Sequence, residues 1–144
     1  RIERLARAMG EGLRRDHEID GTPEPVIAAD VARSYAKITG GAALIMLCLS
    51  MEDMDVYPDA RRSRLEYVMA VQSTAMAGQN LLLAAHEAGL GAFWMCAPLF
   101  CPEVVRAALD LPPGWEPQSL IVLGWPAETP HKSRKALESR LVWR

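Results

Sequence analysis

Residues 70–96 decide the fold, and they read AVQSTAMAGQNLLLAAHEAGLGAFWMC. Together with the charged residues 61–66 before them, they predict one long helix that ends at Gly89 and turns directly into a short buried strand at residues 91–96. Apolar residues occupy opposite sides of this helix, so we expect protein to cover it all round. One side is Leu65, Val68, Met69, Gln72, Met76, Asn80, Leu83 and Glu87, and the other is Val71, Ala75, Leu82 and Ala85.

Three small residues, Ala70, Thr74 and Gly78, lie four positions apart along this helix. Small side chains let a second helix approach closely along such a line. A chain of 144 residues has few spare helices to provide the cover. We therefore expect part of it to come from a second copy of the chain.

Two helices and a strand are expected before the long helix. Apolar residues at helical spacing predict a helix over residues 2–20, and Thr22 is the expected cap of a second helix with Pro23 at its first position. A pair of glycines at residues 40–41 ends that helix. Residues 42–49 are apolar and uncharged, which favours a strand buried on both faces, although a short buried helix also fits.

A short helix and a third strand are expected after the long helix. Residues 104–109 predict the helix, and residues 119–125, which are apolar and β-branched, predict the strand. The end of the chain, residues 141–143, has a strand-like composition. We therefore expect a single α+β domain over residues 1–144, in which helices flank a small sheet.

Composition excludes several classes of partner. The formal net charge is −2 and basic residues are dispersed among acidic ones, so we expect neither a nucleic acid nor a membrane partner. The longest apolar run, residues 41–49, is too short to span a bilayer. The chain has three cysteines, an odd number, and their spacing is that of neither a metal site nor a Cys-x-x-Cys redox motif. A soluble protein in a reducing, cytoplasmic compartment fits best.

Motifs for other chemistries are missing or incomplete. The three histidines lack metal-ligand spacing, and no serine stands in a nucleophile elbow, so no metal site is predicted. Residues 89–91 lack the third glycine of a dinucleotide-binding fingerprint and end a helix instead of opening one. The acidic residues 52–59 lack the glycine and the terminal Glu of a calcium loop, which favours a solvated loop.

An ordered set of segments resembles the C-terminal two-thirds of the nitroreductase family of flavoproteins. The resemblance covers most of the chain from about residue 65 onward, and the set is more specific than any one piece of it. The segments are residues 79–85, 89–97, 102–105, 109–112, 123–126 and 132–134. Within the family, residues 94–95, 109–117 and 142–143 are most similar to the branch that contains the reductase domain attached to deazaflavin-coenzyme ligases.

The resemblance implies an FMN-dependent homodimer, with the flavin at the dimer interface and a C-terminal extension that reaches over the partner. It places Trp94, Met95, Cys96 and Ala97 against the flavin ring through their backbone groups. Fixed backbone N–H dipoles suit a ring that gains negative charge on reduction. No side chain is assigned a catalytic role, and a catalytic Cys96 thiol is disfavoured because no base stands beside it in sequence.

Two basic residues near the end of the chain match the pair that grips the flavin phosphate in the family, namely Lys132 and Arg134. Charge-assisted hydrogen bonds to phosphate are what such a pair can provide. The alternative for both residues is a solvated tail.

One departure from the family concerns the start of the chain. The family opens with an Arg-rich segment and a loop that contact the flavin, and neither precedes Arg1. Either the chain is a fragment whose upstream residues are missing or it is a shortened member that binds flavin poorly. Because no capping residue precedes the first helix, we expect the former.

The resemblance implies a ping-pong oxidoreductase. Hydride passes from NAD(P)H to FMN, and the electrons then pass to an electron-poor small-molecule acceptor. The alternative is a non-catalytic dimeric module of the same fold that binds a flavin or a deazaflavin. Bound FMN and its bleaching by NAD(P)H distinguish the two.

Overall fold

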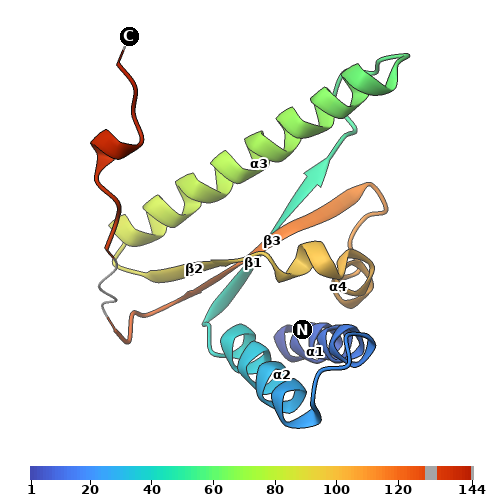
Figure 1. The fold of residues 1–144 in the computed structure, drawn as a ribbon, viewed down its shortest axis with the longest axis vertical. Coiled ribbons are helices and arrows are strands. Elements are labelled where there is room, and N and C mark those ends of the chain that lie inside the picture. The colour runs from blue at the N-terminus through green and yellow to red at the C-terminus, as the bar shows by residue number, and fades with distance from the viewer. Residues whose placement is uncertain (129–132, 144) are drawn as a thin grey trace.

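The computed structural model describes residues 1–128 and 133–143, and its ribbon is shown in Figure 1. Helices and strands follow one another along the chain, and the strands form one antiparallel sheet, as the α+β prediction requires. In chain order, the elements are α1 (Ile2–Ile19), α2 (Glu24–Thr39), β1 (Ala43–Ser50), α3 (Ala60–Glu87), β2 (Gly91–Met95), the 3-10 turn η1 (Ala97–Phe100), α4 (Pro102–Leu109), β3 (Trp115–Gly124) and the 3-10 turn η2 (Leu137–Ser139).

The sheet has the strand order β1-β3-β2, so the last strand in sequence is the central one. Both neighbours are antiparallel to it, with Ile45 and Trp94 on either side of Ile121. The helix α3 covers one face, and α1, α2 and α4 gather on the other side of the sheet (Figure 1). Among the described residues, every helix is too short or too polar to traverse a lipid bilayer.

The main core lies between β3 and the layer of α1, α2 and α4. Burying large aliphatic side chains away from water stabilises the fold by about 1.5–3 kcal/mol for each of them. The expected amphipathic pattern of the first helix supplies three of the core residues. The cluster is Leu5, Ala6, Met9, Ile38, Val105, Ala108, Leu120 and Val122.

Two expectations about these elements were wrong. Residues 42–49 do not form a strand buried on both faces, because β1 is an edge strand and most of its side chains are only half-buried. Thr22 does not cap α2: Pro23 holds the cap position, and the Thr22 hydroxyl lies 3.2 Å from His17 Nδ1 instead.

The long helix α3 is anchored at both ends as its sequence suggests. The Asp59 carboxylate accepts the Arg62 N–H at 3.0 Å, which satisfies a free donor of the first turn. At the other end Gly89 adopts a left-handed conformation (φ 73°), and the Leu90 N–H donates to the Ala85 carbonyl at 2.9 Å. This is the glycine C-cap that the sequence predicts, and β2 begins two residues after it.

The small-residue line of α3 faces its own sheet, which corrects the expectation that it meets another helix. A Cβ atom on Gly78 would overlap the Trp94 ring and lie 2.5 Å from Leu47 Cδ1. Ala70, on the same line, is 6% exposed. Glycine is therefore required at residue 78 by the close approach of β1 and β2.

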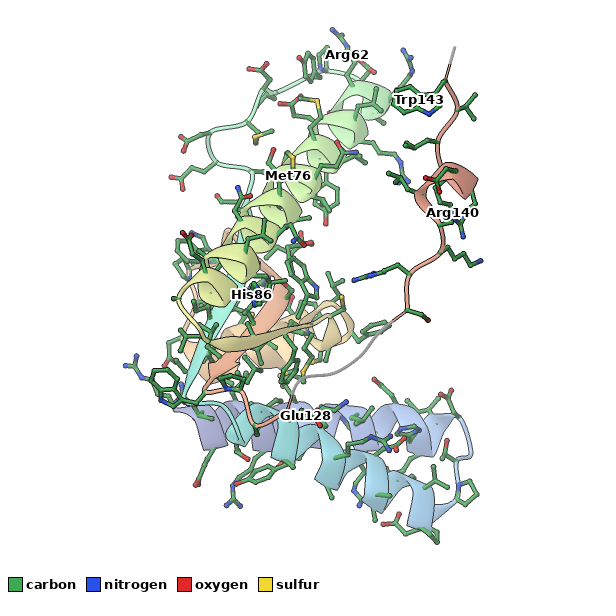
Figure 2. The ribbon with its side chains drawn as sticks, turned by 90° about the vertical axis from the view of Figure 1, so that its left-hand side faces the viewer. Arg62, Met76, His86, Glu128, Arg140 and Trp143 are labelled. Carbon is green, nitrogen blue, oxygen red and sulfur yellow. The ribbon has the colours of Figure 1, made fainter. Side chains whose placement is uncertain are left out.

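The opposite side of α3 is uncovered by the described residues. Its exposed apolar side chains are Leu65, Val68, Met69, Met76 and Leu83. The described residues therefore cover this helix on one side only, and cover of the other side by a second copy stays a prediction. Figure 2 shows α3, with Met76 labelled, standing clear of the α1 and α2 layer.

The strand expected at residues 141–143 is not formed. After η2 the chain is irregular through Trp143, which is 88% exposed. The C-terminal segment extends on the α3 side of the sheet, away from α1 and α2 (Figures 1 and 2). A strand needs an edge to pair with, and this segment reaches none among the described residues.

Candidate functional site

Strand β2 carries two of the four residues expected to contact the flavin ring, Trp94 and Met95, and it is an edge strand. It pairs only with β3, from Gly91 opposite Gly124 to Met95 opposite Leu120. In an antiparallel edge strand, alternate residues turn their N–H and C=O groups away from the sheet. Backbone groups of β2 are thus available to a ligand beside the sheet.

The Trp94 side chain fixes this strand against α3. Its ring lies over Gly78, and its Nε1–H points at Cys96 Sγ over 3.1 Å. The indole is therefore part of the packing between helix and strand. Contact of the Trp94 backbone with a ligand stays a prediction.

The chain turns immediately after β2. Cys96 has a helical backbone (φ −84°, ψ 0°), and its carbonyl accepts the Leu99 N–H at 3.0 Å as η1 begins. The N–H groups of Cys96 and Ala97 donate to no acceptor within residues 1–128 and 133–143. Two adjacent backbone donors at the end of an edge strand form a suitable site for a negatively charged ligand atom.

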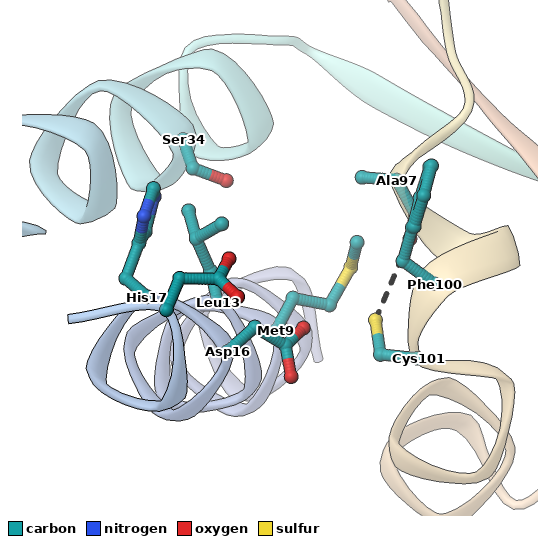
Figure 3. Close-up of a pocket in the computed structure, with 9 residues that line it drawn as sticks. Met9, Leu13, Asp16, His17, Ser34, Ala97, Phe100 and Cys101 are labelled. Atoms are coloured by element: carbon teal, nitrogen blue, oxygen red, sulfur yellow. Dashed lines mark hydrogen bonds between the residues drawn. The ribbon is translucent and has the colours of Figure 1, made fainter. Parts of the chain in front are cut away.

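A cavity of about 340 Å³ opens beside this turn, between α1, α2 and η1 (Figure 3). Pockets that hold small molecules and cofactors have volumes from about 300 Å³ upward. Of the four ring-contacting residues predicted from sequence, Ala97 lines this cavity and the other three do not. The lining is Met9, Leu13, Asp16, His17, Asp20, Ser34, Ala97, Phe100 and Cys101.

One wall of the cavity comes from η1 and the residue after it. Phe100 is 80% exposed, and its ring stands at the side of the cavity opposite His17 in Figure 3. The Cys101 thiol donates weakly to the Ala97 carbonyl, with Sγ 3.6 Å from the oxygen. Burial raises the pKa of Cys101, and the nearby Asp16 carboxylate raises it further. This thiol is neutral at physiological pH and acts as part of an apolar wall.

His17 lies at the rim of the cavity with both ring nitrogens engaged. Nδ1 is 3.2 Å from Thr22 Oγ1, and Nε2 is 3.3 Å from Asp30 Oδ2. These contacts tie the end of α1 to the following turn and to α2. His17 therefore helps to hold the shape of the rim.

The two basic residues expected to bind phosphate are not brought to the cavity. Lys132 lies outside the described residues. Arg134 is exposed in the C-terminal segment and is not among the residues that line the cavity. Its phosphate-binding role stays a prediction. The described residues also contain no group of three His, Cys, Asp or Glu side chains placed to hold a metal ion.

Sequence reasoning missed the α1 contribution to the site. Met9, Leu13, Asp16 and Asp20 follow one another at spacings of four, three and four residues, which places them on one face of α1. The apolar part of that pattern is visible in the sequence, but it predicts packing against the core. Only the tertiary structure shows that the same face continues past the core and borders a cavity.

The model of the nitroreductase family matches residues 3–125 of the chain. The oxygen-insensitive NADPH nitroreductase of Salmonella typhimurium is 37% identical over 78 residues, which is 54% of this chain and 32% of that protein. The 5,6-dimethylbenzimidazole synthase of Rhodospirillum rubrum is 38% identical over 71 residues, which is 47% of this chain and 33% of that protein. Each alignment therefore covers about a third of the curated relative.

Solved structures of nitroreductases are similar in fold to this chain. One is a chain described as a nitroreductase in complex with FMN, from Desulfovibrio desulfuricans. It has a TM-score of 0.64 and 27% identity, and the match covers 78% of this chain and 60% of that one. The α+β architecture found here is therefore the architecture of this group of proteins.

Proposed function

We propose, because the chain belongs to the nitroreductase family, that it is an FMN-dependent oxidoreductase whose flavin ring lies in the cavity between α1, α2 and η1. The observation that carries the proposal is the position of Ala97. It lines a cavity of about 340 Å³, and its N–H and that of Cys96 have no acceptor among the described residues. FMN, when bound, would supply the transfer of a hydride or of single electrons.

The residues of the cavity suit a flat, largely apolar ring. Met9, Leu13 and Phe100 offer apolar contacts, and the backbone N–H groups of residues 96–97, beside the cavity, are the proposed donors to the ring edge that would become negative on reduction. No Lys or Arg lines the cavity among the described residues. The phosphate therefore has to be held from outside it, and because the C-terminal segment extends away from α1 and α2, Arg134 and Lys132 of a second copy of the chain are the proposed holders.

The proposed reaction is a ping-pong cycle. FMN held in the cavity would accept a hydride from NAD(P)H and then pass the electrons to an electron-poor small molecule. The named relatives carry out different reactions, since one is an NADPH nitroreductase and the other a 5,6-dimethylbenzimidazole synthase. Kinship to the deazaflavin-ligase branch and a cytoplasmic location, which suits three free cysteines, are further parts of this proposal.

A homodimer is proposed from the uncovered side of α3. Leu65, Met69, Met76 and Leu83 follow a spacing of four, seven and seven residues and are each at least half exposed. The C-terminal segment adds exposed Val142 and Trp143. An exposed apolar stripe of this length is typical of a protein interface. A second copy that packs along α3 would cover the stripe and offer the C-terminal segment a partner.

Charges placed in this stripe should separate the subunits. In Met69→Lys with Met76→Lys, two ammonium groups would have to be buried without partners, so we expect a monomer where the parent is a dimer. Light scattering coupled to size-exclusion chromatography measures the mass. Ala32→Lys with Ala36→Lys adds the same charge to the exposed side of α2 and should leave the dimer intact. A dimeric mass for the α3 variant would contradict the proposed interface.

The proposed function is tested by the colour of the purified protein. We expect a yellow protein that releases FMN on denaturation and is bleached by NADPH or NADH under anaerobic conditions. A colourless protein that FMN does not reconstitute would contradict the proposal. It would favour the alternative, a non-catalytic module of the same fold.

Loss of a phosphate contact should weaken FMN binding. For Arg134→Ala we expect an FMN dissociation constant raised by at least about tenfold, since charge-assisted hydrogen bonds contribute about 1.5–3 kcal/mol. Quenching of FMN fluorescence measures the affinity. Arg140→Ala, in the same exposed segment, is the matched control. Equal affinities of Arg134→Ala and the parent would show that this residue does not bind the phosphate.

A further inference from the structure

The indole of Trp94 connects α3 to the turn that follows β2. Its ring packs so closely on α3 that a Cβ atom added to Gly78 would overlap it. At the other end of the same side chain, Nε1–H donates to Cys96 Sγ over 3.1 Å. The position of the ring is set by the helix, and the ring in turn holds the Cys96 side chain.

The bond between Trp94 and Cys96 closes a loop that contains backbone. A side-chain hydrogen bond from residue 94 to residue 96 spans the peptide group between Met95 and Cys96. That peptide group carries the Cys96 N–H. A hydrogen bond weakens when its distance or angle changes, so rotations of the backbone inside the loop are opposed. The bond therefore restrains the direction of the Cys96 N–H.

The next peptide group is held by a different hydrogen bond. The Cys96 carbonyl accepts the Leu99 N–H at 3.0 Å. Because the peptide bond is planar and trans, the Ala97 N–H points opposite to this carbonyl, away from the Leu99 amide. Two adjacent N–H groups without an acceptor among the described residues are thus each restrained by a neighbouring bond.

The side chains of the turn lie on different sides of it. Cys96 Sγ lies with the indole, which packs on α3, whereas Ala97 lines the cavity between α1, α2 and η1 (Figure 3). Neither the Trp94 nor the Cys96 side chain lines that cavity. The bond between them acts on the two N–H groups from outside the cavity, so it can orient them without touching a ligand there.

We propose that Trp94 is a positioning residue, whose indole N–H holds Cys96 and thereby orients the N–H groups of residues 96–97 toward the flavin ring. The inference rests on the proposed function, because these donors meet a flavin only if the ring lies in the cavity. Donors that are fixed in advance stabilise negative charge without having to reorient. The bond therefore favours reduced over oxidised FMN.

Variants that break the bond should change the reduction potential of bound FMN. Cys96→Ala removes the acceptor at an exposed position, and Trp94→Phe removes the donor while keeping an aromatic ring over Gly78. For each we expect the preference for reduced over oxidised FMN to fall by about tenfold, which lowers the two-electron potential by about 30 mV. Spectroelectrochemistry of the FMN-loaded protein measures the potential.

Three further variants separate positioning from a general loss of packing. Cys96→Ser keeps a hydrogen-bond acceptor and should restore most of the potential. Trp94→Phe with Cys96→Ala should shift the potential no more than either single change, because both break the same bond. Phe93→Leu alters an exposed ring of β2 and is the matched control with the potential of the parent. Additive shifts in the double variant would contradict the proposed bond.

NMR relaxation on the flavin-free protein separates this inference from the proposed function. In the parent, the amides of residues 96 and 97 should have the order parameter of rigid backbone, about 0.85, and lower values in Trp94→Phe and Cys96→Ala. This result supports the positioning role even if the protein binds no FMN, which overturns the proposed function alone. Unchanged order parameters in both variants, or an unchanged potential of bound FMN, would overturn the inference without affecting the proposed function.

Discussion

Replacing Ala97 by tryptophan is expected to abolish FMN binding, with an affinity lowered by at least about 100-fold, or about 3 kcal/mol. Ala97 lines the cavity of about 340 Å³ and is drawn at its edge in Figure 3. An indole at this position would occupy the space proposed for the flavin ring. Because the cavity already exists, the folded chain can accommodate the larger side chain within it.

Fluorescence titration with FMN measures this effect, and circular dichroism shows whether the variant is folded. Ala107→Trp is the matched control, since Ala107 is exposed on α4 and does not line the cavity. The control should bind FMN like the parent. A folded Ala97→Trp protein with the affinity of the parent would place the flavin elsewhere.

Replacing Gly78 by valine is expected to lower the free energy of unfolding by about 3 kcal/mol. The new Cβ would overlap the Trp94 ring and lie 2.5 Å from Leu47 Cδ1. The helix backbone, the indole and the leucine cannot all keep their places. Urea denaturation followed by circular dichroism measures the loss. The shift of Trp94 would also displace the end of β2, so FMN affinity should fall with stability.

Two companion variants assign this loss to the contact with β2. Ala77→Val changes the exposed neighbouring position of α3. It should lower the free energy of unfolding by less than about 1 kcal/mol, which is the usual effect of a β-branched side chain in a helix. Gly78→Val with Trp94→Leu should be less destabilised than the sum of its single variants, because the smaller side chain makes room. Strict additivity would mean that the two residues do not compete for the same space.

The local elements were predictable from sequence because their signals are local. Gly89 ends α3 in the left-handed conformation that glycine adopts easily, and the alternating strands and helices around it follow from apolar spacing. Membership of the family was also confirmed, since it rests on several short segments in a fixed order along the chain, whereas the branch within the family stays a proposal.

The orientation of α3 was not predictable because both of its sides are apolar. Its small residues suggest close packing, but they do not say against what. The structure places Gly78 against the Trp94 ring of its own sheet and leaves Met69 and Met76 exposed. Likewise, the composition of residues 141–143 favours a strand, but a strand also needs a free edge in the right place.

The candidate site was predictable only where a single segment forms it. The turn at residues 96–97 follows from the end of β2, and its backbone N–H groups have no acceptor among the described residues, while their contact with a flavin stays a prediction. The cavity beside it combines α1, α2 and η1, which are far apart in sequence. Asp16 and Asp20 look like ordinary surface residues of an amphipathic helix until this packing is known.

The central claim is that the cavity bordered by Ala97 holds the flavin ring, and a crystal structure of the protein saturated with FMN tests it most directly. We expect density for the ring between α1 and η1, with the N–H of Cys96 or Ala97 within hydrogen-bonding distance of the ring. FMN bound at another place, with this cavity unchanged and empty of it, would contradict the claim.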